Sequence, residues 1–366
     1  MAQEIKLALK PLRKKKKMTQ KELAERMNVS FQTISKWENG HVMPDISYLP
    51  ALAEIFEVEL EVLLGLKSME VDTLQHYDEE DYWKNRLECT KNWKMLFYNE
   101  DYLEFLVKKV WRIEKPVKIL DCACGYGYLG MQLLPLLPEG SSYTGIDICE
   151  AYLEEGKRLF SDLPYPADFI QGDIREYNIE ETYDVVISQI FLSYLNNPQK
   201  VLKKMKQALK PGGMLIAIDN NYALMEEDCF LADERGELQK DVPDWKKIWQ
   251  YSLEKGEMDW RTGTKLPFLL RQIGLKKVDA RISDRVFIYD GTDPLYSKKE
   301  IEKYRNIVSN YDWVKQGYMY YMKRGCTSQE AEQFVHYQDR FEEVLQSSSV
   351  FAVKACCLHI VWGYLE

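Results

Sequence analysis

A loop of small residues and two acidic residues further along the chain could together bind a nucleoside. The loop runs from Asp121 to Gly127 (DCACGYG) and follows the apolar segment VKILDCA. Small residues let a ligand approach the backbone closely, and a helix that begins behind them favours negative charge. Asp147, twenty residues beyond Gly127, can accept hydrogen bonds from both hydroxyls of a ribose. Asp173 can accept one from the exocyclic amine of adenine.

The elements that must position these residues alternate between strands and helices from residue 117 onward. The expected strands are VKILDCA, SYTGIDI, ADFIQGD, YDVVISQ and MLIAID, and the expected helices are YLGMQLLPLL, AYLEEGKRLF and PQKVLKKMKQAL. This alternation predicts a parallel sheet with helices on both faces. Because such sheets bind ligands at the carboxyl ends of their strands, we expect the loop and the acidic residues to meet at one edge.

These segments resemble the class I S-adenosylmethionine-dependent methyltransferases. ILDCACGYG is similar to their first motif, GIDI and GDI to their acidic and adenine loops, and LKPGG to the turn before their fifth strand. The resemblance covers residues 115–220. It implies a Rossmann-like domain whose mostly parallel seven-stranded sheet ends in an antiparallel strand, with KKVDARI and FAVKACCLHIVWGYLE as strands six and seven. A nicotinamide-binding domain is the main alternative, but it usually has three loop glycines and no LKPGG turn.

The resemblance also implies a set of residues that bind S-adenosylmethionine. Asp121 and the loop surround the methionine part of the cofactor. The end of the second strand holds the ribose, and the end of the third strand holds the edge of the adenine. The end of the fourth strand borders the sulfonium and the methyl acceptor. The implied residues are Asp121, Ala123, Gly125, Gly127, Asp147, Ile148, Asp173, Ile174 and Gln189. Ala123 departs from the family, which usually has glycine there. Methyl transfer mainly requires alignment of the reactants, so the sequence identifies no catalytic residue.

We expect the methyl acceptor to be a small molecule. The fourth strand ends SQIFLSYL, without the Asn/Asp-Pro-Pro-Tyr that relatives methylating nucleic-acid bases carry there. Aromatic stretches such as YDWVKQGYMYYMKRG could cover an acceptor cavity. Two alternatives stay open. The domain could bind S-adenosylmethionine only as an effector of a transcription regulator, or it could methylate DNA or RNA to which another part of the chain directs it.

The charge of the chain is unevenly distributed. The formal net charge is −9, yet residues 1–41 carry +6 and residues 69–366 carry −11. A basic head on an acidic body indicates that only the head meets a polyanion. Lys14 to Lys17 form its most basic run, for which we expect phosphate contact. The alternative is a solvated charge run at a helix C-terminus.

Five short helical patterns fit the basic head, and two of them form a motif. Thr19 to Glu22 predicts a capping box at the start of one helix, and Asn28 can end that helix in a left-handed conformation. Ser30 caps the next helix, which should bury Ile34 and Trp37 and end at Asn39-Gly40. Two short helices joined by a tight turn fit the major groove of DNA.

The run MTQKELAERMNVSFQTISKWENG closely resembles the Cro/repressor-like (XRE) helix-turn-helix family, and PDISYLPALAEIFEVELEVLLG resembles its last two helices. The resemblance implies that residues 1–68 bind double-stranded DNA as a homodimer. The second helix of the motif then reads bases through Phe31, Gln32, Thr33 and Lys36, while Gln20 and Asn39 hold phosphates.

With 366 residues, the chain is expected to be multidomain. We predict an all-α helix-turn-helix domain at 1–68, a helical linker or lid at 69–114, and an α/β methyltransferase-type domain at 115–366 with a helical insertion at about 296–348. No long apolar run or secretory signal predicts a membrane span or export. Eight cysteines without zinc-site spacing favour a reduced, cytoplasmic protein with no metal site. The linker is rich in aromatic rings, namely Tyr77, Tyr82, Trp83, Trp93, Phe97, Tyr98 and Tyr102.

Overall fold

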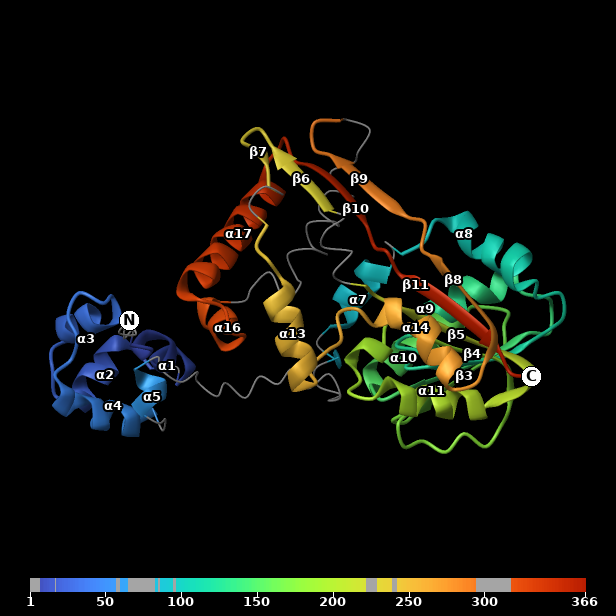
Figure 1. Ribbon diagram of the computed structural model, residues 1–366, viewed down its shortest axis with the longest axis horizontal. Coiled ribbons are helices and arrows are strands. Elements are labelled where there is room, and N and C mark those ends of the chain that lie inside the picture. The colour runs from blue at the N-terminus through green and yellow to red at the C-terminus, as the bar shows by residue number, and fades with distance from the viewer. Residues whose placement is uncertain are drawn as a thin grey trace. The chain divides into compact units, whose positions relative to one another are not determined.

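A computed structural model describes most of the chain as two compact units, Met1–Leu74 and Gln75–Glu366 (Figure 1). The described residues are 7–16, 18–56, 60–64, 83–84, 86–94, 97–221, 229–238, 242–293 and 317–366. Several predicted features lie outside these residues. They are Lys17, the linker up to residue 82 with Tyr77 and Tyr82, and the first part of the predicted insertion. The boundaries predicted at 68 and 114 stay a prediction.

The first unit is a bundle of short helices, as the sequence predicts. Its helices are α1 (Leu9–Lys15), α2 (Gln20–Met27), α3 (Phe31–Glu38), α4 (Leu49–Phe56) and α5 (Leu60–Leu63), with a 3-10 turn, η1 (Ile46–Tyr48). Each α-helix contributes to one apolar core, in which Leu9, Leu23, Ile34, Leu52 and Leu63 are fully buried.

The predicted helix ends of the motif are confirmed. The backbone N–H of Glu22 donates to Thr19 Oγ1 at 3.2 Å, and the Glu22 carboxylate accepts from the Thr19 backbone at 2.6 Å. Asn28 ends α2 in a left-handed conformation with φ 51°, and Ser30 caps α3. Because Ile34 and Trp37 face the core, the opposite side of α3 is left for contact with another molecule.

A buried polar network joins the first three helices. Arg13 Nε donates to Glu38 Oε1 at 2.6 Å, and Gln20 Nε2 donates to Glu38 Oε2 at 2.7 Å. Arg13 also donates to the backbone oxygen of Met18 at 2.7 Å. Burial disfavours the charged Glu38, but the hydrogen bonds from Arg13 and Gln20 outweigh it, so the pKa of Glu38 lies below its usual value.

Replacing Glu38 with Gln should lower the unfolding free energy of the first unit by about 2–4 kcal/mol, because Arg13 then loses the charge that compensates its partial burial. The lowered pKa means that this stabilisation is present above about pH 4.3 and disappears as the pH falls through the folded-state pKa. Calorimetry of the full chain measures the effect against Glu25→Gln, a matched change at an exposed position of α2. Equal unfolding temperatures at pH 7 would contradict the prediction.

The second unit is built on a seven-stranded sheet in the order β3-β2-β1-β4-β5-β11-β8. Its strands are β1 (Lys118–Cys122), β2 (Ser142–Asp147), β3 (Ala167–Gln171), β4 (Tyr183–Gln189), β5 (Leu209–Asp219), β8 (Lys276–Ile282) and β11 (His359–Tyr364). All neighbours pair in parallel except β11, which is antiparallel to β5 and β8. The predicted α/β architecture is confirmed. LKPGG, however, was predicted to form a turn before the fifth strand, and it lies within β5 instead. The pairing of β5 with β4 shifts its register next to this segment.

Helices cover both faces of this sheet. Helices α9 (Tyr128–Leu133) and α10 (Glu150–Phe160) share one apolar core with the π-helical segment η2 (Leu106–Trp111). Helices α11 (Pro198–Gln207) and α14 (Thr262–Gln272) share the core on the other face. The apolar strands are therefore buried on both sides, as parallel strands usually are.

A smaller sheet in the order β7-β6-β10-β9 extends the second unit. It consists of β6 (Cys229–Asp233), β7 (Gly236–Glu237), β9 (Val286–Asp290) and β10 (Phe351–Ala355). Helix α17 (Ser328–Gln346) shares a core with this sheet, and α16 (Tyr318–Lys323) shares another with α13 (Lys246–Lys255). FAVKACCLHIVWGYLE was expected to form one strand but forms two. Cys357, at φ 49°, interrupts it because the left-handed conformation cannot continue a strand.

Among the described residues before the first strand of the second unit are helices α7 (Leu87–Lys94) and α8 (Glu100–Phe105), followed by η2. Phe97, Tyr98 and Trp111 are buried in the core beside β1 and β4. Among the described helices, none has the length and apolar character that crossing a membrane requires.

Candidate functional site

The loop between β1 and α9 follows the carboxyl end of β1. The backbone N–H of Cys124 donates to Ile146 O at 3.0 Å, which ties the loop to β2. Gly127, at φ 78°, is the residue before the first turn of α9. A Cβ there would lie 2.9 Å from the Phe160 ring. Glycine is therefore needed at 127 both for its backbone conformation and for space.

Asp147 ends β2 and reaches this loop. Its Oδ2 accepts the backbone N–H of Gly125 at 2.7 Å, and its Oδ1 accepts that of Cys149 at 2.9 Å. The side chain is buried, with 9% of its surface exposed. The structure thus brings together the glycine loop and the carboxylate that the sequence predicted for a ribose.

The other two predicted carboxylates are already engaged by protein groups. Asp121 is 2% exposed and accepts from the Tyr143 hydroxyl at 2.8 Å. Asp173 accepts from the backbone N–H and the Nε of Arg175 at 2.8 and 2.9 Å. Burial disfavours the charged Asp173, but the Arg175 hydrogen bonds lower its pKa. An adenine amine at Asp173 would share this carboxylate with Arg175.

The two predicted isoleucines differ in exposure. Ile148, directly after β2, is half-buried, whereas Ile174 is buried in the core shared with α11 and α14. Ile148 is therefore the better placed of the two for packing on a ligand.

Gln189 ends β4 and is bound to the segment that precedes β1. Its Nε2 donates to the Tyr98 hydroxyl at 2.6 Å. Both residues are buried, at 7% and 5% exposed, and burial raises the pKa of Tyr98 far above its usual value. Within the described residues, Gln189 Oε1 has no hydrogen-bond partner. A buried carbonyl oxygen of this kind suits a ligand or a water as donor.

Asp219, at the end of β5, is a further acidic residue at a strand end, for which the sequence predicts no role. It is fully buried and accepts the backbone N–H groups of Asn220 at 2.9 Å, Ser193 at 3.1 Å and Phe191 at 3.2 Å. It thereby fixes the turn that follows Gln189. Burial outweighs these bonds and raises the pKa of Asp219 to about 6. The sequence does carry a signal for Asp219, because the apolar run MLIAID ends in an acidic residue, just as SYTGID ends in Asp147.

The raised pKa of Asp219 predicts a pH effect. The folded state holds this proton more tightly than the unfolded chain, whose aspartates titrate near 3.9. Stability therefore falls as the pH rises from about 4 to about 6, by roughly 2–3 kcal/mol. Asp219→Asn should remove this part of the pH dependence. Unfolding curves of the two proteins measured from pH 4 to pH 7.5 test it, and parallel stability profiles would show that Asp219 does not titrate in this range.

Ala123 adopts φ 58°, a conformation that costs a residue with a Cβ about 1–2 kcal/mol. Ala123→Gly should relieve this strain but increase the entropy of the unfolded chain. We expect a net gain of about 0.5–1 kcal/mol in unfolding free energy. Chemical denaturation measures the change, with Ala151→Gly inside α10 as a control expected to destabilise. A destabilised Ala123→Gly protein would contradict the strain argument.

In the first unit, the predicted base-reading residues lie along α3. Phe31 is 49% exposed, and Gln32 and Lys36 are also exposed. Thr33 is half-buried, and its hydroxyl lies 2.8 Å from that of Ser30. Three of the four predicted side chains, Phe31, Gln32 and Lys36, are thus exposed to solvent on α3.

The two predicted phosphate-binding residues differ. Asn39 is exposed, whereas Gln20 directs its amide to Glu38. Of the lysine run, Lys16 is exposed, and the side chains of Lys14 and Lys15 lie outside the described part of the chain.

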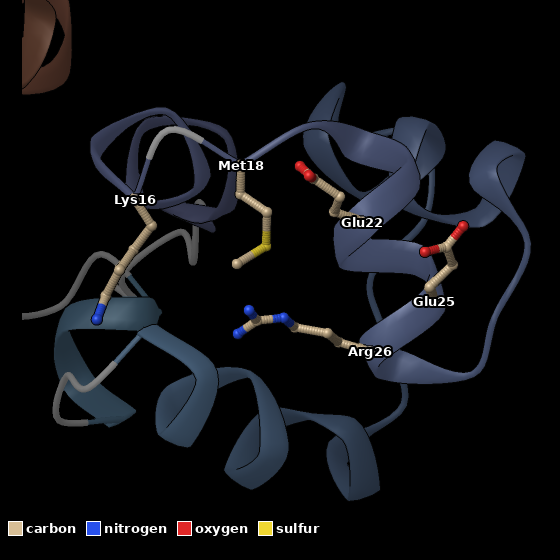
Figure 2. Close-up of a pocket in the computed structure, with 5 residues that line it drawn as sticks. All are labelled: Lys16, Met18, Glu22, Glu25 and Arg26. Atoms are coloured by element: carbon tan, nitrogen blue, oxygen red, sulfur yellow. The ribbon is translucent and has the colours of Figure 1, made fainter.

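A hollow of about 430 Å³ lies on the same unit (Figure 2). Figure 2 shows Met18 and Arg26 extending into it. Its lining residues are Lys16, Met18, Glu22, Glu25 and Arg26. Two carboxylates balance two cations, which gives the hollow no preference for an anion. Among the described residues, no group of three or more potential ligands could hold a metal ion.

Each of the two units contains a segment that is similar to known proteins. A helix-turn-helix family model matches residues 9–63, and a methyltransferase domain model matches residues 113–257. The malonyl-[acyl-carrier protein] O-methyltransferase of Halalkalibacterium halodurans is 28% identical over 149 residues, which are 37% of this chain and 54% of that protein. The demethylmenaquinone methyltransferase of Staphylococcus aureus is 30% identical over 128 residues, 32% of this chain and 53% of that protein. The chain spans about half the length of these relatives.

The similarity to solved structures is weaker, both in sequence identity and in TM-score. Phosphoethanolamine N-methyltransferase 2 of Haemonchus contortus, in complex with S-adenosyl-L-methionine, is 12% identical with a TM-score of 0.44. The aligned part covers 80% of this chain and 59% of that one. An S-adenosylmethionine-dependent methyltransferase of Clostridium acetobutylicum is 21% identical, with a TM-score of 0.31 and coverage of 36% and 59%. The assignment therefore rests on the family models and the sequence relatives: the chain carries a helix-turn-helix domain and a methyltransferase domain homologous to the S-adenosylmethionine-dependent enzymes.

Proposed function

We propose that the second unit binds S-adenosylmethionine at the carboxyl ends of β1, β2 and β4 and transfers its methyl group to a small molecule. The observation that carries this proposal is the hydrogen bond between the Asp147 carboxylate and the Gly125 backbone. It joins the glycine loop to an anionic group at the next strand end, where a charged acceptor suits the two hydroxyls of a ribose.

The residues present fit this cofactor. The Asp147 carboxylate is held in place by two backbone N–H groups, which keeps it oriented for further hydrogen bonds. Ile148 offers an apolar surface to the adenine, and Asp173 with Ile174 borders its edge. Asp121, Ala123, Gly125 and Gly127 shape the space for the methionine part. When bound, S-adenosylmethionine supplies a methyl group activated by its sulfonium.

The acceptor side is formed by Gln189 and Tyr98. Both are buried, so bulk solvent is kept from this point and the neutral phenol keeps its proton. Gln189 Oε1 is free of protein donors among the described residues and orients a hydroxyl or amine of the acceptor. The protein thus contributes alignment and exclusion of water, which are the main requirements of a direct displacement.

Two findings argue against a nucleic-acid acceptor and so favour the small molecule. The segment SQIFLSYL after Ile187 lacks the proline-containing motif of base-modifying relatives. The matched relatives are named for malonyl-[acyl-carrier protein] and for demethylmenaquinone, neither of which is a nucleic acid.

Labelled methyl transfer tests the proposal. The full chain is incubated with trideuteromethyl S-adenosylmethionine and either a deproteinised small-molecule extract or duplex DNA, and mass spectrometry locates the label. We expect the label in the small-molecule fraction, and Tyr98→Phe to reduce its rate of appearance. Label found in DNA alone would overturn the small-molecule assignment. Binding without any transfer would favour an effector-binding regulator.

We also propose that the first unit binds double-stranded DNA as part of a homodimer and regulates transcription. The helix-turn-helix match and the exposed side of α3 support DNA binding. The half-sites would lie about one helical turn apart. The cysteines whose side chains the structure describes are buried free thiols. Free thiols of this kind suit a reducing compartment such as the cytoplasm.

A further inference from the structure

Three large apolar side chains are exposed on the segment that joins α3 to α4, here called the α3–α4 segment (residues 39–48). The side chains of Val42, Met43 and Ile46 are 52%, 47% and 79% exposed. Single exposed apolar residues are common on protein surfaces and need no explanation, whereas a patch of them marks a contact with another molecule. The proposed function gives these three residues no role, because the expected base-reading residues all lie on α3 itself.

Internal contacts fix the turn that carries this patch. The Asp45 carboxylate accepts from the backbone N–H and the hydroxyl of Ser47 at 2.9 and 2.6 Å. Pro44, in the middle of the patch, is buried. The ring of Tyr48 lies 5.3 Å from that of Trp37, which belongs to the core of the unit. The apolar side chains are therefore presented by an ordered turn, and a partner does not have to order it on binding.

The patch residues carry no charge, which decides what kind of partner they fit. A phosphate backbone would require cations at this place. The head as a whole is positive, with +6 over residues 1–41, so two heads repel each other wherever their charged surfaces meet. The three apolar side chains offer a place where two identical copies can touch without burying a charge. Such a patch can pair with itself across a two-fold axis.

A two-fold dimer on DNA also requires its contact to lie within reach of α3. The recognition helices of such a dimer enter successive turns of the major groove, about 34 Å apart, so each lies about 17 Å from the two-fold axis. Ile46 is the eighth residue after Glu38, at which α3 ends. Eight residues span at most about 28 Å. The patch can therefore reach the axis while α3 lies in the groove.

The small size of the patch predicts how strong this contact is. Stable interfaces bury roughly 800 Å² on each partner, which is more than three side chains on one turn supply. We therefore expect no stable association through this surface in free solution. A duplex that holds two copies on adjacent half-sites raises their effective concentration, and the same weak contact then suffices.

We infer that Val42, Met43 and Ile46 form the surface through which two copies of the first unit touch on DNA, patch against patch across the two-fold axis of the site. This inference deepens the proposed function and rests on it, because it requires that the first unit binds a palindromic duplex. Cooperative binding to the two halves of the site depends on the patch, whereas binding to one half does not.

The test compares a full site with a half site. The full chain selects a duplex out of random DNA, and a second duplex keeps one half of that site and scrambles the other. Fluorescence anisotropy gives the cooperativity factor, which is the affinity of the second copy for the full site divided by the affinity of one copy for the half site. We expect the wild type to show a factor of roughly ten or more.

Three substitutions at exposed positions locate the contact. Ile46→Gln and Met43→Gln should each bring the cooperativity factor toward one and leave the half-site affinity at the wild-type value. Leu253→Gln is the matched control, because Leu253 is an apolar residue of α13 with a similar exposure of 51%. It should change neither quantity. Because each factor compares two affinities of one variant, a loss of active protein does not imitate a loss of cooperativity.

A cysteine in the patch reports the contact directly. Ile46→Cys or Met43→Cys should form a disulfide between two copies on the full site and none on the half site, with glutathione disulfide as the oxidant. Such a bridge requires the two Cα atoms to come within about 7 Å of each other. Mass spectrometry of the linked peptides identifies the bridge. Glu54→Cys, at an exposed position of α4, should form no such bridge.

Two results would overturn the inference. One is a cooperativity factor that Ile46→Gln and Met43→Gln both leave at the wild-type value. The other is that neither Ile46→Cys nor Met43→Cys links two copies on the full site, including the case in which the new thiol bridges to the second unit of its own chain. A protein that binds no duplex, or that selects a site without two-fold symmetry, would instead refute the proposed function.

Discussion

Asp147→Ala is expected to weaken S-adenosylmethionine binding roughly 10- to 150-fold, that is by about 1.5–3 kcal/mol. The variant removes a charged acceptor from the proposed ribose site. It also releases the Gly125 backbone N–H, which Asp147 now binds at 2.7 Å, so the glycine loop keeps its backbone hydrogen bond to Ile146 but loses this second attachment to β2. Isothermal calorimetry of the full chain measures the change.

Two further substitutions make this measurement specific. Asp168→Ala removes an exposed carboxylate from the neighbouring strand β3 and should leave the affinity unchanged. Asp173→Ala should have a smaller effect than Asp147→Ala, because Arg175 already neutralises that carboxylate. Wild-type affinity in Asp147→Ala would exclude the proposed location of the cofactor.

Neutralising Lys14 to Lys17 with glutamine should weaken binding to every DNA sequence and flatten its dependence on salt. Each lost phosphate contact is expected to lower the slope of log affinity against log salt by about one. Gel shifts between about 50 and 200 mM salt measure the slope. A slope equal to that of the wild type would show that the run is only a solvated group of charges.

Gln32→Ala should act differently from the lysine changes. Gln32 is exposed on α3 and is expected to pair with a base, so its loss should cost about 1–3 kcal/mol at the selected site and relax the preference at one position. The salt slope should stay as in the wild type. Equal weakening on all sequences would indicate a phosphate contact instead.

Local signals in the sequence predicted local structure well. The capping box of Thr19 and Glu22 and the left-handed Asn28 depend on residues within one or two turns of the chain, and each was found as expected. Strands β1, β2 and β5 were also predictable, because their apolar runs are each followed by an acidic residue or a glycine-rich loop.

Features that depend on distant parts of the chain were not predictable. The smaller sheet pairs Phe351 with Ala232 and with Asp290, and no periodicity in one segment reveals such partners. Asp173 carries the expected residue type, but only the structure shows that Arg175 binds its carboxylate. The turn after Gln189 depends in the same way on Asp219, which lies in another strand.

Hydrogen exchange of the full chain, measured by mass spectrometry with and without S-adenosylmethionine, tests whether the cofactor binds at the carboxyl ends of β1, β2 and β4. We expect slower exchange in peptides that contain Gly125 to Gly127, Asp147 to Cys149 and Gln189 to Ser193, whose backbones border the proposed site. Peptides of the smaller sheet, such as Phe351–Ala355, should exchange as before. Protection confined to other parts of the second unit, with none at these strand ends, would contradict the account.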